Sequence, residues 1–256
     1  MPKLAAQDKF LDLSDYGRAG GKLIANTLKN TRFTPIHVTL LFGISGLMAI
    51  GFILKNHYYS AGFFIILKSI IDAADGELAR VKNSPSYIGR YLDSLFDIVL
   101  NFLLLTAIYS VSNSSFILTL LAFFCIQLQG TVYNYYYVIL RNKSVSGDKT
   151  SKIFENKIPK ALGKESQKWV TILFKTYIVF YGGFDKIIYK LDHEAAKLKT
   201  FPNWFMTLVS IYGLGFQLLL ISIMLACNWI EYIIPFFIMY SLFIPIIIGI
   251  RKIYIK

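Results

Sequence analysis

The stretch DAADGELARVKNSPSYIGRYLDSLFD, residues 72–97, contains four aspartates and lies between two apolar runs, residues 61–71 and 98–111. Apolar runs on both sides of a polar stretch are typical of two membrane helices joined near the membrane surface. At about 100° per residue, Asp72 and Asp75 share one face of the first helix. Asp93 and Asp97, four residues apart, share one face of the second. We therefore expect an all-α membrane fold in which two helices bring four carboxylates together.

Four carboxylates in one place repel one another unless cations neutralise them. Carboxylate oxygens are hard ligands that suit Mg²⁺ or Mn²⁺. A charged side chain near membrane depth costs roughly 2.5 to 3.5 kcal/mol on insertion scales, so such acids are not retained without a role. The stretch therefore predicts a divalent-metal site. The alternative is that the acids are solvated at the interface and paired with Arg80, Lys82 and Arg90.

The composition is that of a polytopic membrane protein. Hydrophobic residues make up 55% of the 256 residues and charged residues only 16%, a balance that a soluble globule of this size does not need. The net charge of +12 favours anionic lipid over nucleic acid as a partner in so hydrophobic a chain. Cys125 and Cys227 lie in apolar runs without disulfide or metal spacing, which indicates small core residues.

The apolar runs predict six transmembrane helices after a polar N-terminal segment. These are residues 36–54, 59–74, 92–111, 116–140, 204–227 and 230–250. Residues 34–256 would form one membrane domain, in which residues 141–200 are a basic cytoplasmic connection. The tyrosines and asparagine of residues 133–137 are interpreted as an interfacial aromatic belt, with a headgroup pocket as the alternative.

Two segments outside the predicted spans have apolar and basic residues interleaved. Residues 1–33 are expected to form interfacial amphipathic segments, broken near Gly20 and Gly21, with a disordered tail as the alternative. Residues 168–191 are aromatic and amphipathic but interrupted by Lys175, Gly182 and Gly183. We predict that they form an interfacial helix between the fourth and fifth spans, rather than a transmembrane one.

The distribution of basic residues predicts the orientation of the chain in the membrane. With both termini in the cytoplasm, 25 of the 27 lysines and arginines fall in cytoplasmic segments, 13 of them in residues 141–200. Only Lys55 falls in an outer loop, and Lys68 lies within a span, where structural and functional roles are equally open. The four aspartates would therefore open to the cytoplasmic face.

The spacing of residues 72–97 resembles the signature of the CDP-alcohol phosphatidyltransferase family, D-x2-D-G-x2-A-R-x8-G-x3-D-x3-D. All eight fixed positions are met, by Asp72, Asp75, Gly76, Ala79, Arg80, Gly89, Asp93 and Asp97. So many fixed residues over 26 positions make a specific signature, although it covers only a tenth of the chain. The resemblance implies a phospholipid-synthesising integral membrane enzyme, and it also implies a homodimer.

The resemblance also implies roles for individual residues. Asp72, Asp75 and Asp93 would be the principal ligands of two Mg²⁺ or Mn²⁺ ions, and Asp97 would be the catalytic base that also reaches the second ion. Nucleotide-binding residues would be Asp72, Gly76, Ala79, Arg80 and Thr39. The family commonly has an asparagine after the proline that opens the first span, whereas Ile36 follows Pro35 here.

The acceptor side of the predicted site is less defined. Residues 147–152 partly resemble a Gly-Lys-x-Lys-Thr-like stretch of phosphatidylglycerophosphate synthases. On that basis a phosphorylated acceptor would contact Arg141, Lys149, Thr150 and Lys152. The alternative is that these residues belong to a positive-inside loop that touches anionic lipid.

Three functions are compatible with the sequence. The first is transfer of a phosphatidyl group from CDP-diacylglycerol to a small polar alcohol with release of CMP. The second is a CDP-choline or CDP-ethanolamine type of enzyme that acts on diacylglycerol and shares the same signature. The third is a divalent-cation channel or transporter that uses the aspartates as an ion path. The size of the chain and the six-span plan favour the first.

Overall fold

The computed structural model describes residues 4, 8–143, 152, 155, 157–163, 165–198 and 200–255. Within these ranges the regular structure is entirely helical, as predicted. The helices of the first half are α1 Arg18–Leu28, α2 Pro35–Leu54, α3 Tyr58–Val81, α4 Tyr87–Val111 and α5 Phe116–Lys143. The second half contains α6 Gln167–Leu191, α7 Asn203–Ser210, α8 Leu214–Ala226, α9 Ile230–Tyr240 and α10 Phe243–Tyr254. Two short 3-10 helices, η2 Leu13–Asp15 and η3 His193–Lys197, complete the described elements.

Four helical segments are long and apolar enough to cross a membrane. They are Pro35–Leu54, Tyr87–Val111, Phe116–Asn142 and Ile230–Tyr254, and the bent pair α7 and α8 would be a fifth. α3 is long enough, but its second half carries the first half of the aspartate stretch and several other charges. The structure therefore supports an integral membrane protein with four or five candidate spans, and the predicted count of six is not confirmed.

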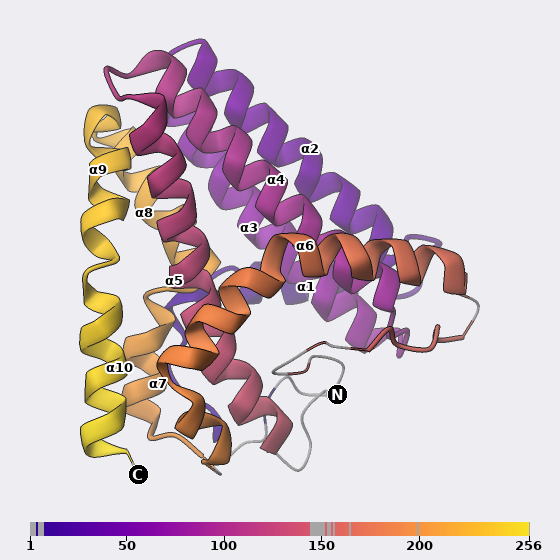
Figure 1. Ribbon diagram of the computed structural model, residues 1–256. Coiled ribbons are helices and arrows are strands. Elements are labelled where there is room, and N and C mark those ends of the chain that lie inside the picture. Colours follow the sequence, from indigo (N-terminus) through magenta and orange to yellow (C-terminus); the bar gives the residue numbers. More distant parts are fainter. Residues whose placement is uncertain are drawn as a thin grey trace.

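α3 and α4 carry the aspartate stretch and lie side by side with α2 (Figure 1). α3 runs on past the predicted end of the second span to Val81 and is followed by Asn83 in a left-handed conformation (φ 48°). Ser86 then caps α4 by accepting a hydrogen bond from the Gly89 backbone N–H. Asp72 and Asp75 thus lie within one helix and Asp93 and Asp97 within the next, as the periodicity predicted.

The fifth predicted span is not one straight helix. α7 and α8 meet at an angle of 46°, at residues 211–213. A Cβ atom at Gly215 would overlap the carbonyl oxygen of Ser14, so this glycine lets the N-terminal segment lie against the start of α8. The break also brings the backbone N–H of Leu13 within 3.0 Å of the Ser210 hydroxyl, to which it donates a hydrogen bond. Residues 204–227 were predicted as one span, and this bend, which lies beside Gly213 and Gly215, was not predicted.

The predicted break near Gly20 and Gly21 is wrong, because α1 runs through both residues. A Cβ atom at Gly21 would lie 2.9 Å from the carbonyl carbon of Ala73, closer than side chains approach backbone. These glycines therefore serve close packing of α1 against α3 rather than a turn. The interfacial placement of residues 1–33 remains a prediction.

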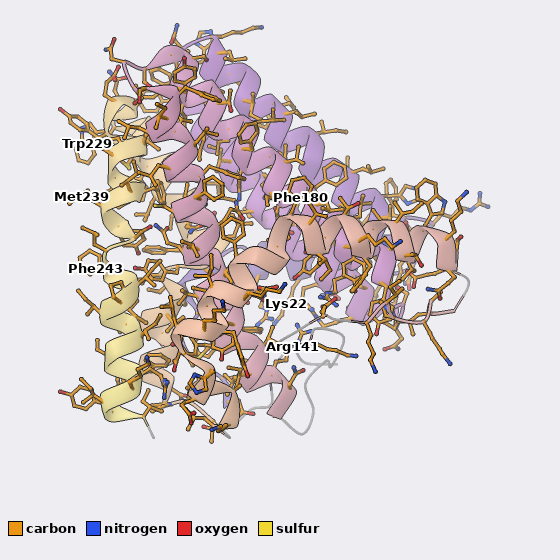
Figure 2. All side chains as sticks on the ribbon, viewed as in Figure 1. Lys22, Arg141, Phe180, Trp229, Met239 and Phe243 are labelled. Carbon is orange, nitrogen blue, oxygen red and sulfur yellow. The ribbon has the colours of Figure 1, made fainter. Side chains whose placement is uncertain are left out.

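α6 crosses the front of α3, α4 and α5 instead of running parallel to them (Figure 1). It is continuous through Gly182 and Gly183 and is not among the helices apolar enough to span. This agrees with the predicted interfacial helix without confirming it. Exposed apolar side chains elsewhere, such as Trp229, Met239 and Phe243, project outward from α9 and α10 (Figure 2). Such a surface suits contact with lipid tails.

A buried ion pair joins the end of α6 to α10. The Asp192 carboxylate pairs with Arg251 and accepts a hydrogen bond of 2.7 Å from the Tyr136 hydroxyl. Asp192 is 1% exposed and Arg251 4% exposed. Tyr135 donates a further hydrogen bond to the Asp192 carbonyl oxygen, so α5, α6 and α10 meet at this aspartate.

Candidate active site

A cavity of about 410 Å³ lies where α3, α4, α5, α6 and α8 meet the N-terminal segment. Its lining is strongly acidic, with seven carboxylates against the two guanidinium groups of Arg18 and Arg80. The carboxylates are those of Asp15, Asp72, Asp75, Glu77, Asp93, Asp97 and Asp185. In a protein of net charge +12, this concentration of negative charge makes the cavity electrostatically favourable for cations.

Asp72, Asp75 and Asp93 form the centre of the cavity. Each offers one carboxylate oxygen, and these three oxygens lie within 4.8 Å of one another. Asp93 Oδ1 is buried and has no hydrogen-bond partner within the described part of the chain. Three hard oxygen donors with a buried unpaired oxygen among them fit a divalent cation such as Mg²⁺ or Mn²⁺. The structure thus brings together the three residues predicted as principal metal ligands.

Asp97 differs from these three aspartates because it has a cation of its own. Its carboxylate forms an ion pair with the ammonium group of Lys68, whose side chain is 3% exposed. The Lys68 Nζ also lies 5.1 Å from the centre of the Phe42 ring. The role of Lys68, which the sequence left open, is therefore to compensate and orient Asp97. Asp97 still lines the cavity beside Asp93, one helical turn away.

Thr39 forms a hydrogen bond with one member of the aspartate trio. Its hydroxyl donates a hydrogen bond of 2.7 Å to Asp75 Oδ2, and its side chain is buried, with 1% exposure. Thr39 is not one of the residues that line the cavity. The predicted contact between Thr39 and a nucleotide is untested, whereas its contact with Asp75 positions a predicted metal ligand.

Of the other residues predicted to contact a nucleotide, Gly76 and Arg80 line the cavity, whereas Ala79 does not. A Cβ atom at Gly76 would have the Arg80 guanidinium as its nearest neighbour, 3.6 Å away. Gly76 therefore leaves open space between the α3 backbone and the Arg80 side chain. A flat or elongated ligand could approach the helix closely there.

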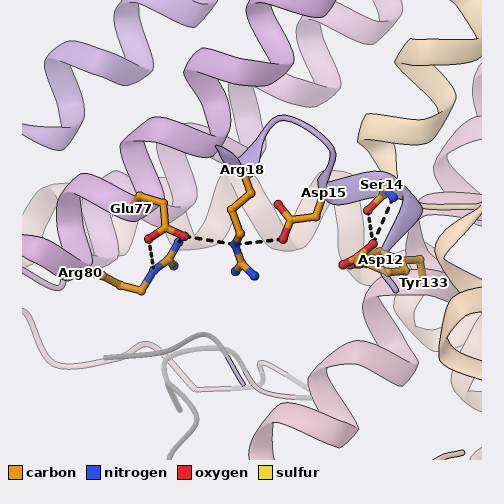
Figure 3. A network of polar contacts seen from close by, with 7 residues as sticks. All are labelled: Asp12, Ser14, Asp15, Arg18, Glu77, Arg80 and Tyr133. Carbon is orange, nitrogen blue, oxygen red and sulfur yellow. Dashed lines mark hydrogen bonds and ion pairs between the residues drawn. The ribbon is translucent and has the colours of Figure 1, made fainter. Parts of the chain in front are cut away.

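Arg18 is a cavity residue that the signature does not contain. Its Nε lies 3.1 Å from both Glu77 Oε1 and Asp15 Oδ2, while Arg80 Nη2 lies 3.0 Å from the same Glu77 oxygen (Figure 3). One carboxylate thus holds two guanidinium groups at the wall of the cavity. Beside them the Tyr133 hydroxyl donates to Asp12 Oδ2 at 2.6 Å, which fixes the N-terminal segment against α5.

Two glutamates of the connection between α5 and α6 hold the N-terminal end of α4. Glu165 accepts hydrogen bonds from the Ser86 hydroxyl at 2.6 Å and from the backbone N–H of Ile88 at 2.9 Å. Burial alone would raise the pKa of Glu165, but these hydrogen bonds outweigh it and leave the pKa below its ordinary value. Glu155 forms an ion pair with Arg90 and accepts from the Tyr91 hydroxyl. The helix that carries Asp93 and Asp97 is therefore anchored from a segment expected to be merely basic.

Of the residues predicted to bind the acceptor, only Arg141 and Lys152 fall within the described part of the chain. Arg141 and Lys152 do not line the cavity, and Lys149 and Thr150 lie outside the described residues. Tyr177, Tyr181 and Asp185 of α6 do line it, four residues apart on one face of the helix. The i, i+4, i+8 spacing was present in the sequence, but residues 168–191 were predicted only to form an interfacial helix and these three residues were not identified as site residues.

Comparison with known proteins agrees with this site. A family model described as CDP-alcohol phosphatidyltransferase matches residues 32–230. The chain is 41% identical over 70 residues to a CDP-diacylglycerol–serine O-phosphatidyltransferase of Saccharomyces cerevisiae, covering 25% of each chain. It is 39% identical over 67 residues to an enzyme of the same name from Bacillus subtilis, covering 26% of this chain and 38% of the relative. The matched segments therefore span well under half of either relative.

Proposed function

Since the chain belongs to the CDP-alcohol phosphatidyltransferase family, we propose that it transfers the phosphatidyl group of CDP-diacylglycerol to the hydroxyl of a small polar alcohol and releases CMP. The observation that carries this proposal is the convergence of Asp72, Asp75, Asp93 and Asp97 in one cavity of an all-helical, apolar chain. The proposed orientation, with both termini and the cavity on the cytoplasmic side, rests on the distribution of basic residues.

Serine is the acceptor that we propose. Both relatives are named as CDP-diacylglycerol–serine O-phosphatidyltransferases. The cavity is also unsuited to a phosphorylated alcohol, because its two guanidinium groups are outnumbered by carboxylates and both contact Glu77. A phosphorylated acceptor would need several further cations beside those that the CDP moiety requires.

Asp72, Asp75 and Asp93 would hold the divalent ions, and two ions would balance the trio and the pyrophosphate better than one. When bound, such ions supply charge neutralisation on the pyrophosphate and Lewis-acid polarisation of the phosphorus under attack. Thr39 keeps Asp75 in place for this role through its hydrogen bond. Arg80 and Arg18 would contact the nucleotide or its phosphates, since both guanidinium groups lie on the cavity wall.

Asp97 would act as the general base. The acceptor oxygen forms a bond to the phosphorus that bears the diacylglycerol, the bond from that phosphorus to the bridging oxygen breaks, and CMP leaves with the electron pair. The acceptor's proton passes to the Asp97 carboxylate. The ion pair with Lys68 holds this carboxylate in one orientation, and no covalent enzyme intermediate is required.

The proposal is tested by measuring CMP release from purified protein in detergent, with CDP-diacylglycerol, Mg²⁺ or Mn²⁺, and single acceptors. The panel is serine, ethanolamine, inositol, inositol phosphate and glycerol phosphate. We expect CMP and phosphatidylserine with serine, and no release from Asp97→Asn even where the divalent ion and CDP-diacylglycerol still bind.

Two outcomes would overturn the proposal. CMP release only when CDP-choline or CDP-ethanolamine meets diacylglycerol would identify the second type of enzyme. Divalent-cation flux into liposomes without any lipid product would instead identify a transporter. Exclusive use of another acceptor in the panel would retain the reaction and reject serine. The homodimer implied by the resemblance is tested separately, by the mass of the detergent-solubilised protein.

A further inference from the structure

Six of the seven carboxylates of the cavity have either a cationic partner or the proposed metal role, and one carboxylate has neither. Asp72, Asp75 and Asp93 form the metal trio, and Asp97 has Lys68. Asp15 and Glu77 both contact Arg18, and Glu77 also contacts Arg80. For the side chain of Asp185, by contrast, the described residues provide neither an ion pair nor a hydrogen bond. Asp185 has no part in the roles proposed above.

Asp185 lies on a wall that is fixed relative to the reacting aspartates. The Tyr181 hydroxyl, one turn before it, donates a hydrogen bond of 2.8 Å to the carbonyl oxygen of Ser94, the residue next to Asp93. The rings of Tyr177 and Tyr181 stack with their centres 4.9 Å apart. α6 is thereby attached to α4 at the level of Asp93 and Asp97, and Asp185 follows on the same face of α6.

The surroundings of Asp185 compensate its charge only in part. Burial, together with the nearby Glu155 carboxylate, raises the pKa of Asp185 to about 7, although Arg90 opposes this. The Arg90 guanidinium is already engaged with Glu155 and lies over the rings of Tyr91 and Tyr177, 5.0 and 5.8 Å from their centres. A ligand that carries its own positive charge would provide Asp185 with the missing partner.

We propose that Asp185 and the tyrosine face beside it bind the ammonium group of an amino-alcohol acceptor, an inference that rests on the transferase function proposed above. A carboxylate forms charge-assisted hydrogen bonds with an ammonium group, and aromatic rings attract cations to their faces. The site thus selects amino alcohols over neutral polyols and phosphorylated alcohols. Asp185 is a substrate-binding residue in this assignment, while Tyr181 positions it.

The kinetic test compares wild type with Asp185→Asn at neutral pH. The KM for serine should rise roughly 10- to 100-fold, as expected for loss of a hydrogen-bonded charge partner. The KM for CDP-diacylglycerol and the Mg²⁺ requirement should stay unchanged. Asp185→Glu should recover part of the affinity for serine. Glu194→Gln, which removes an exposed carboxylate that pairs with Lys197, is the matched control and should behave as wild type.

A binding test does not depend on turnover. O-methylserine keeps the ammonium group but lacks the reactive hydroxyl, so in the presence of Mg²⁺ it should raise the melting temperature of wild type and Glu194→Gln. The same addition should leave Asp185→Asn unchanged. An equal response of wild type and Asp185→Asn to O-methylserine would overturn the assignment, as would an unchanged KM for serine.

The two proposals fail in different ways. If no acceptor releases CMP from CDP-diacylglycerol, the transferase proposal fails, while the melting experiment still reports whether Asp185 binds an ammonium group. If serine is used and Asp185→Asn raises the KM for serine and the KM for CDP-diacylglycerol together, the reaction stands and the ammonium site is wrong.

Discussion

Two groups of buried charge lie in the two halves of this helical protein, and they are built on opposite principles. In one, Asp192 faces Arg251 and accepts a hydrogen bond from Tyr136, so positive and negative charge balance within the protein. In the other, Asp72, Asp75 and Asp93 face one another, and Asp93 Oδ1 has no hydrogen-bond partner in the described part of the structure. The first group is balanced within the protein, whereas the second is a cluster of like charges that could hold a metal ion.

The difference separates structural from functional acids in a chain that contains both. Burying a charge is unfavourable unless it is paired, so a balanced group indicates a role in holding helices together. An unbalanced group lowers stability until a ligand binds and is retained for what it binds. Asp97 stands between the two, because it belongs to the cavity but is paired with Lys68.

The largest loss of stability is expected at the balanced group, the ion pair of Asp192 and Arg251. Asp192→Asn would leave the Arg251 guanidinium buried without its counter-charge and should lower the free energy of unfolding by about 3 to 5 kcal/mol. Thermal unfolding in detergent measures this loss. The double variant Asp192→Leu with Arg251→Met should be more stable than either single change, because no charge is then left unpaired. A melting temperature equal to that of wild type for Asp192→Asn would show that the pair contributes nothing.

At the unbalanced group, removal of a carboxylate is not expected to lower the free energy of unfolding. In EDTA, Asp93→Asn should be at least as stable as wild type because one of three repelling charges is removed. Mg²⁺ at about one hundred times its dissociation constant should stabilise wild type by about 2.7 kcal/mol, and Asp93→Asn by much less. The same unfolding assay with and without Mg²⁺ measures both. Equal stabilisation of the two proteins by Mg²⁺ would remove Asp93 as a ligand.

A smaller effect, on the Mg²⁺ requirement, is expected at Thr39, which donates a hydrogen bond to Asp75 of the unbalanced group. Thr39→Val keeps the shape of the side chain but removes the hydrogen bond to Asp75, worth about 1 kcal/mol. The Mg²⁺ concentration that gives half-maximal CMP release should therefore rise roughly 5-fold. Thr39→Ser retains the hydroxyl and should stay close to wild type. If Thr39→Val instead raises only the KM for CDP-diacylglycerol, Thr39 contacts the substrate rather than the metal ligand.

The smallest effect is expected at Glu165, which caps α4 outside both groups. Because its pKa is lowered in the folded protein, its carboxylate stabilises the fold above its ordinary pKa of 4.5, and this contribution is lost as the pH falls through and below that value. Glu165→Gln should lower the free energy of unfolding by roughly 0.5 kcal/mol at pH 7, the level of a partly solvated helix cap, and by less near pH 4. A loss independent of pH would mean that the charge is unimportant.

The sequence was sufficient for the class of fold and for the grouping of Asp72, Asp75 and Asp93. Both follow from local spacing, because residues three or four apart share a helix face and long apolar runs form membrane helices. Pairings between distant segments were not predictable in this way. The partner of Glu165 is the start of α4, 77 to 79 residues earlier in the chain, and Lys68 pairs with Asp97 across 29 residues. No local pattern indicates which residues such side chains will meet.

Two further misses have specific physical causes. The bend between α7 and α8 lies where Ser14 approaches Gly215, and an apolar pattern carries no information about such an approach. Asp185 was hidden because a carboxylate on an amphipathic helix is normally exposed to water. Only the crossing of α6 over α4, fixed by the hydrogen bond from Tyr181 to Ser94, turns that face toward the cavity.

The contact between Ser14 and Gly215 also bears on how the protein is made. The four aspartates of residues 72–97 leave the ribosome long before Gly215 and Gln217, which also line the cavity. In a partly synthesised chain, the helices that carry the four aspartates would therefore already be in the membrane. The segment with Gly215 and Gln217, which completes the cavity lining, would still be missing. Completion of the bent fifth segment would then dock the N-terminal residues and create the binding site in one late step of biogenesis.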